Sequence, residues 1–187
     1  MNPHVLIVYH TSEGQTARIA ERIADELRRD ELDVDVREVD EAPIPDGYDG
    51  VVAGDSIHAV KHSRALVRYL QDHAATLRTK PTALFQVSLT SANPDEAHTD
   101  TAHELVRDLL ERTDFDPGII GIFAGALVYT QYGWLKRHVM QAIVRREGGD
   151  TDMSHDYDYT DWGAVDHFAA DVAAMITARA RDDTGAA

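Results

Sequence analysis

Small hydroxyl side chains and a glycine, with no lysine among them, make up the loop HTSEGQTA at residues 10–17. The loop separates the apolar run VLIVY at 5–9 from a helical pattern that begins near residue 15. Backbone N–H groups in the first turn of a helix are free, and the helix dipole favours negative charge there. The loop hydroxyls add donors, and Gly14 lets the backbone come close to a ligand. These residue types at this spacing favour an anion-binding loop.

A helix that caps itself explains the same loop without a ligand. Thr11 or Ser12 would then accept from a first-turn N–H group, and Glu13 or Gln15 would complete a local hydrogen bond. The loop alone does not distinguish the two interpretations, so the rest of the chain has to.

Strand-like apolar runs alternate with helical patterns along the 187 residues. The first run is nearly continuously apolar, as a strand buried on both faces is, whereas the second alternates apolar and charged residues. Strict alternation with short links predicts an α/β fold, in which a doubly wound parallel sheet carries helices on both faces. The expected strands lie at 4–9, 34–36 with Val39 just beyond, 50–54, 83–89 and 118–125, and the expected helices at about 15–29, 63–77, 98–112 and 161–180.

Ligands bind such sheets beyond the carboxyl ends of the strands, where the strand order switches. The loops at 10–16, 54–63 and 88–98 meet that condition. No linker or repeat divides the chain, so a single domain is expected over 1–180, followed by a disordered tail at 181–187.

Other phosphate, catalytic and metal motifs are absent or incomplete. A triphosphate loop needs GxxxxGK[ST] and a dinucleotide fingerprint needs GxGxxG, and neither occurs. The run GDSIH at 54–58 nearly matches the hydrolase elbow GxSxG, but His58 stands where the second glycine is required. The acidic run at 150–156 lacks the sixth-position glycine and twelfth-position glutamate of a calcium loop. His58 and His62 have no third ligand at metal spacing, so no metal site is expected.

What remains for the first loop is a phosphate monoester bound by N–H groups and hydroxyls. A single phosphate needs fewer cationic partners than a triphosphate, so a loop without lysine suffices. Flavin mononucleotide (FMN) meets this description.

Acidic side chains outnumber basic ones, 33 to 18, and give a formal net charge of −15. Nucleic acid is therefore an unfavourable partner. With no cysteine, the chain has no disulfide, iron–sulfur cluster or thiol nucleophile. So acidic and lysine-poor a surface is typical of halophilic proteins, whose salt screens the repulsion, and an ordinary acidic cytosolic protein is the alternative. Neither a bilayer-spanning segment nor a leader pattern occurs, so a cytoplasmic location is expected.

Five segments carry a resemblance to a known family and occur in order over about 4–175: TSEGQT at 11–16, GDSIH at 54–58, AGAL at 124–127, GGDTD at 148–152 and YTDW at 159–162. With them the chain resembles the flavodoxins. More narrowly, it is similar to the flavodoxin-type, menaquinone-dependent protoporphyrinogen dehydrogenases (oxidases) of haem and porphyrin biosynthesis. The first segment alone indicates only a flavodoxin, and the later ones point to the dehydrogenase branch.

The resemblance implies a flavodoxin-like five-stranded sheet in the order 2-1-3-4-5, non-covalent FMN, and electron transfer from protoporphyrinogen or another small redox substrate to a quinone. By position, the first loop holds the phosphate, and the loops at 56–62 and 88–94 flank the isoalloxazine ring. Members often have glycine where this chain has Val60, a departure that bears on how the loop meets the flavin. The implied cofactor-binding residues are Thr11, Ser12, Glu13, Gly14, Gln15, Thr16, Ser56, Ile57, His58, Ser88, Leu89, Thr90, Ser91, Ala92 and Asn93.

The insert at about 127–160 is too long for a plain connection between the fifth strand and the last helix. Within it, 133–147 places four basic residues beside an apolar stripe: Lys136, Arg137, Arg145 and Arg146. A basic amphipathic helix suits an anionic membrane surface, here the inner face of the cell membrane, or a quinone entrance. A helix packed on the domain or at a homodimer interface is the alternative.

The features together favour an FMN-dependent protoporphyrinogen dehydrogenase with a quinone acceptor. The cofactor carries the redox chemistry, so no essential acid–base residue is named. His58 is a candidate proton relay, because imidazole exchanges protons near neutral pH, or else a plain loop residue. The competing class is a flavodoxin-type electron carrier that docks partners through its acidic surface. A binding module without flavin leaves the donors of the first loop unexplained.

Overall fold

A parallel β-sheet in the order β2-β1-β3-β4-β5 forms the centre of the molecule. The computed structural model describes residues 2–88, 96–127 and 157–185, and within them this sheet has five strands. The order confirms the doubly wound, flavodoxin-like α/β sheet that the sequence predicts. The strands are β1 (His4–His10), β2 (Asp33–Glu38), β3 (Gly50–Ser56), β4 (Thr82–Ser88) and β5 (Ile119–Ala124).

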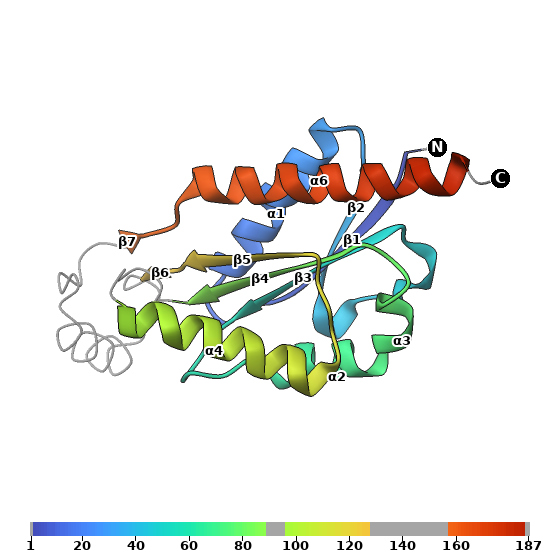
Figure 1. The fold of residues 1–187 in the computed structure, drawn as a ribbon. Coiled ribbons are helices and arrows are strands. Elements are labelled where there is room, and N and C mark those ends of the chain that lie inside the picture. The colour runs from blue at the N-terminus through green and yellow to red at the C-terminus, as the bar shows by residue number, and fades with distance from the viewer. Residues whose placement is uncertain (1, 89–95, 128–156, 186–187) are drawn as a thin grey trace.

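Helices cover both faces of the sheet (Figure 1). One face carries α1 (Gln15–Arg29) and α6 (Trp162–Gly185), which pack on each other as well as on the sheet. The other face carries α2 (Arg64–Asp72), the short α3 (Ala74–Leu77) and α4 (Glu96–Thr113). Single 3₁₀ turns, η1 (Val39–Glu41) and η2 (Pro45–Gly47), connect β2 to β3.

The alternation of side chains along β1 explains why the sheet needs two layers of helices. Val5 and Ile7 are fully buried in the core beneath α1 and α6, while Leu6 and Val8 are fully buried in the core beneath α2 and α4. Successive strand residues point to opposite faces, so an unbroken apolar run is stable only when both faces are covered.

All five strands are parallel, so their carboxyl ends meet at one edge of the sheet. A small antiparallel pair lies at this edge, formed by β6 (Ala126–Leu127) and β7 (Tyr157–Asp158) (Figure 1). This pair brings the two ends of the inserted segment together beside the place where ligands bind in such sheets.

Apart from shifts of one or two residues at element ends, the observed elements differ from the expected ones in two places. The helix expected at 63–77 is divided at His73, which leaves the helical conformation (φ −113°) and packs its ring 4.6 Å from that of Tyr69. Residues 181–185, expected in a disordered tail, continue α6, because each residue added to an existing helix gains a hydrogen bond without a new nucleation step.

The basic helix expected at 133–147 lies outside the described residues. Among the helices that are described, none has the length and apolar character of a bilayer span.

Candidate functional site

The N-cap residue of α1 makes no side-chain hydrogen bond to the first turn of the helix. Gly14 occupies the N-cap position in the left-handed region (φ 88°, ψ −16°), and its position has no side chain to cap the helix. Thr11 bends back instead, and its Oγ1 accepts from the Gly14 N–H at 2.9 Å. The Thr11 hydroxyl therefore serves the turn before the helix, and the N-cap position itself has no side-chain hydrogen bond to the first turn of α1.

A small cavity of about 100 Å³ opens in front of this helix start, at the carboxyl edge of the sheet. Residues from the β1–α1 loop, the end of β3, the end of β4 and the start of β6 surround it: Thr11, Ser12, Glu13, Gln15, Thr16, Ser56, Ile57, His58, Val87, Ser88, Gly125 and Ala126. Pockets that enclose a drug-sized ligand have about 300–1,000 Å³. The described residues therefore enclose a group the size of a phosphate and not a whole flavin.

Most of the site residues expected from the sequence meet at this cavity. The lining includes nine of them: Thr11, Ser12, Glu13, Gln15, Thr16, Ser56, Ile57, His58 and Ser88. Gly14 contributes the turn described above. The remaining five, Leu89, Thr90, Ser91, Ala92 and Asn93, lie outside the described residues.

Three lining residues were not among those expected: Val87, Gly125 and Ala126. Gly125 and Ala126 belong to the AGAL segment at 124–127, which the sequence offered only as part of the resemblance. The rule that ligands meet every strand end near the switch point was the signal that could have assigned them a place in the site.

The donor set fits a phosphate monoester. It includes the backbone of the first turn of α1 and the hydroxyls of threonines and serines, and no lysine or arginine is among the described residues that line the cavity. Arg18, one turn into α1, is held elsewhere: its Nη1 donates to Gln15 Oε1 at 2.8 Å and lies 3.2 Å from Asp158 Oδ2.

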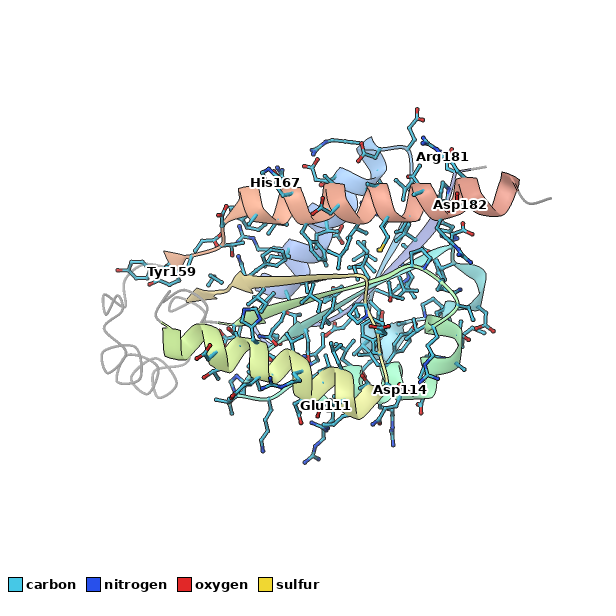
Figure 2. All side chains as sticks on the ribbon, in the orientation of Figure 1. Glu111, Asp114, Tyr159, His167, Arg181 and Asp182 are labelled. Atoms are coloured by element: carbon cyan, nitrogen blue, oxygen red, sulfur yellow. The ribbon has the colours of Figure 1, made fainter. Side chains whose placement is uncertain are left out.

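Gln15 connects β7 and the residues after it to the start of α1 through hydrogen bonds. Its side-chain amide, nearly buried, donates to Asp158 Oδ1 at 3.0 Å and to Thr160 Oγ1 at 2.7 Å. Thr160 Oγ1 donates in turn to the Ala124 carbonyl at the end of β5. The segment that returns to α6 is therefore bound directly to the loop that faces the cavity, and Tyr159 lies at that same end of the molecule (Figure 2).

A buried carboxylate lies directly behind the cavity. Asp55 is fully buried, and its Oδ2 accepts from His62 Nδ1 at 2.9 Å and from the Ser63 N–H at 2.8 Å. Its Oδ1 lies 3.3 Å from His10 Nδ1. Burial alone would raise the pKa of the Asp55 carboxyl, but the nearby His10 ring and the hydrogen bonds from His62 and Ser63 outweigh it and hold the pKa below its ordinary value.

Two serines link His10 to the cavity. Ser56 Oγ lies 3.3 Å from His10 Nδ1 and 3.2 Å from Ser12 Oγ, and both serines line the cavity. The same ring nitrogen thus faces both Asp55 and Ser56. A Ser-His-Asp hydrolase needs the two imidazole nitrogens to serve the serine and the acid separately, so this cluster does not have that geometry.

The turn that follows β3 is backbone-strained. His58 and Lys61 pair as an isolated antiparallel bridge, and the two residues between them, Ala59 (φ 50°) and Val60 (φ 59°), both have left-handed backbones. A β-branched residue in that region is an outlier, and Val60 is also 58% exposed. Glycine would adopt this backbone conformation without the same strain.

Comparison with known proteins agrees with this geometry. A family model described as "Flavodoxin domain" matches residues 6–154. The protoporphyrinogen IX dehydrogenase (quinone) of Leishmania major is 36% identical over 181 residues, which are 93% of this chain and 76% of that protein. The Escherichia coli K12 protein of the same name is 34% identical over 170 residues, covering 90% of this chain and 93% of its own.

A solved structure supports the same fold. The flavodoxin of Streptococcus pneumoniae TIGR4 matches 91% of this chain and 98% of its own with a TM-score of 0.54, at 18% identity. This chain is therefore a member of the flavodoxin domain family, and the relatives that it matches over most of its length are quinone-dependent protoporphyrinogen IX dehydrogenases.

Proposed function

We propose that this protein is an FMN-dependent protoporphyrinogen IX dehydrogenase that passes electrons to a quinone. The observation that carries the proposal is the match, over 90% or more of the chain, to proteins of that name from two distant organisms. The uncapped start of α1 and the cavity in front of it supply a place for the FMN phosphate.

The chain's own residues bind and orient the cofactor. The N–H groups of Gln15 and Thr16 and the hydroxyls of residues 11–16 hold the phosphate, because a dianion is the natural partner of an uncapped helix start. The loops at 56–62 and 88–94 flank the isoalloxazine ring. Of their residues, Ser56, Ile57, His58 and Ser88 line the cavity. When bound, FMN supplies the redox chemistry between the porphyrinogen and the quinone.

His58 is the residue that we assign to proton exchange with solvent. It lines the cavity and is itself exposed, so its imidazole connects the bound ligand with bulk water. Imidazole exchanges protons readily near neutral pH.

The finer assignments rest on the sequence. We propose menaquinone as the acceptor, peripheral contact with an anionic membrane through residues 133–147, and adaptation to high salt. Glutamine at Lys136, Arg137, Arg145 and Arg146 tests the contact: the variant should lose binding to anionic liposomes at matched ionic strength and keep its FMN. A helix that serves a homodimer interface would instead leave liposome binding unchanged.

A non-enzymatic electron carrier is the second candidate, favoured by the acidic surface with its net charge of −15. An anaerobic assay separates the two. FMN-loaded protein is mixed with protoporphyrinogen IX and an excess of a menaquinone analogue, and porphyrin fluorescence is followed. Many porphyrin molecules formed per protein support the dehydrogenase, whereas formation limited to the amount of protein, or none, supports the carrier.

Two matched histidine variants sharpen the assay. His58→Asn should slow turnover when the protein is saturated with FMN. His167→Asn, on the exposed side of α6, should leave turnover unchanged (Figure 2). Equal turnover in both variants would show that His58 has no role in proton exchange.

A further inference from the structure

A series of contacts, Asp55–His10–Ser56–Ser12, connects a buried carboxylate to the cavity. The chemistry of these groups determines which of them donates and which accepts in each contact. An ionised carboxylate only accepts hydrogen bonds. Oδ2 of Asp55 accepts from His62 and from the Ser63 N–H, while Oδ1, which accepts no hydrogen bond from the described residues, lies 3.3 Å from His10 Nδ1. A lone pair on that nitrogen would repel Oδ1, so His10 Nδ1 carries a hydrogen.

The direction propagates to the cavity. Since His10 Nδ1 is a donor, Ser56 Oγ, 3.3 Å away, is the acceptor of that contact. The hydroxyl hydrogen of Ser56 is then free to point to Ser12 Oγ at 3.2 Å, and the hydrogen of Ser12 is free to point into the cavity. A histidine that accepted at Nδ1 would draw the Ser56 hydrogen away from the cavity instead.

A proton on His10 also favours an anion in the cavity. The Asp55 carboxylate raises the pKa of His10 above its ordinary value, with smaller contributions from Glu38 at the end of β2 and Asp40 in η1, while partial burial opposes the shift. On the far side, His62 shares Asp55 with His10. Toward the cavity, Glu13 is the acidic residue of the lining. A proton held at His10 places a positive charge behind a cavity whose described lining has no lysine or arginine.

We infer that His10, seated on Asp55, is a positioning residue for the cofactor phosphate: it aligns the hydroxyls of Ser56 and Ser12 toward the anion and places a positive charge behind them. This inference rests on the proposed FMN site. It adds to that site a proton that is taken up or retained when the phosphate binds. FMN binding should therefore raise the pKa of His10 further.

The test compares FMN with riboflavin, which has the same ring and no phosphate, by flavin fluorescence between pH 7 and 9. The wild-type affinity for FMN should fall with rising pH, by at most about tenfold per pH unit because one proton is linked. Riboflavin affinity should stay flat. NMR of the imidazole protons should show a higher His10 pKa with FMN than with riboflavin.

Two substitutions at His10 separate its donor from its charge. His10→Asn keeps an N–H near the position of Nδ1 and should bind FMN with a flat pH profile, close to the wild-type affinity at pH 9. His10→Leu removes the donor as well and should bind FMN more weakly at every pH. His167→Asn serves as the control and should keep the wild-type profile.

Asp55→Asn tests the inference independently, because a neutral amide does not stabilise a positive charge on His10. The fall in FMN affinity should shift to lower pH, and thermal melting shows whether the variant is folded. Identical FMN profiles in wild type and His10→Asn would overturn the inference while leaving the FMN site intact. No preference for FMN over riboflavin at any pH would instead contradict the proposed site itself.

Discussion

Gly54 lies directly against the ring of Phe85: a β-carbon at Gly54 would come within 2.1 Å of Phe85 Cζ. The two residues are register partners on β3 and β4, and Phe85 is fully buried beneath α1 and α6. The glycine that resembled part of a hydrolase elbow is therefore a packing requirement of the central sheet.

Gly54→Ala should destabilise the protein by about 1–3 kcal/mol, the usual cost of overpacking a filled core. Gly47→Ala is the matched control, because a β-carbon there meets no atom within 4 Å. Urea unfolding of both variants checks this, and equal stability of the two would show that Phe85 moves aside at no cost.

Val60→Gly should stabilise the turn after β3. A side chain in the left-handed region destabilises the folded state by roughly 1–2 kcal/mol. The greater freedom of glycine in the unfolded chain offsets about 0.5–1 kcal/mol of the gain from removing it. We expect a net gain of up to about 1 kcal/mol by chemical denaturation. Ile44→Gly, at an equally exposed position with φ −63°, should lose stability instead, and a loss in both variants would argue against strain at Val60.

Asp55 should make the fold sensitive to acid. Its pKa is lower in the folded protein than the value of about 3.9 in an unfolded chain, so its contribution is fully present above that value. The contribution is lost as the pH falls through the folded pKa. Denaturation midpoints from pH 7 to pH 3 should show Asp55→Asn less stable than wild type at pH 7, with the gap closing toward pH 3.

Asp171→Asn, at an exposed position on α6, is the control for that series. It should follow the wild-type curve across the whole range. A gap between Asp55→Asn and wild type that stayed constant from pH 7 to pH 3 would mean that the variant acts through packing and not through charge.

Stability should rise with salt. With 33 acidic against 18 basic side chains, repulsion opposes the compact state where screening is weak. Between 0.1 M and 1 M KCl the Debye length shortens from about 10 Å to about 3 Å. The melting temperature should increase steeply over that range, and a flat curve would remove the proposal of adaptation to high salt.

The sheet was predictable because each strand has a recognisable pattern in its own residues. β1 is an unbroken apolar run buried on both faces, and α1 was expected at the bounds it has, since its buried residues recur at helical spacing. The loop at 11–16 was predictable for the same reason: its residues are contiguous, and the strand and helix around it set its geometry.

The cluster behind the cavity was not predictable from the sequence. His10 and Asp55 are register partners at the ends of β1 and β3, so they meet only once the strand order is known. His62, noted earlier for its spacing from His58, turns its Nδ1 to Asp55 instead. The division of the expected helix at His73 accompanies a local contact instead, with the ring of Tyr69 four residues earlier, which the helical spacing of the apolar residues does not reveal.

The most direct test of the account is the loss of a single hydroxyl at the start of α1. Thr16→Val keeps the shape of a side chain that is 1% exposed and removes a donor that we assign to the phosphate. A hydrogen bond to a charged group contributes about 1.5–3 kcal/mol. Affinities for FMN and riboflavin are measured for wild type, Thr16→Val and Thr177→Val, a matched change on the distant half of α6. FMN binding should weaken roughly ten- to a hundredfold in Thr16→Val alone, with riboflavin binding unchanged; equal losses for both flavins, or no loss for either, would contradict a phosphate at this helix start.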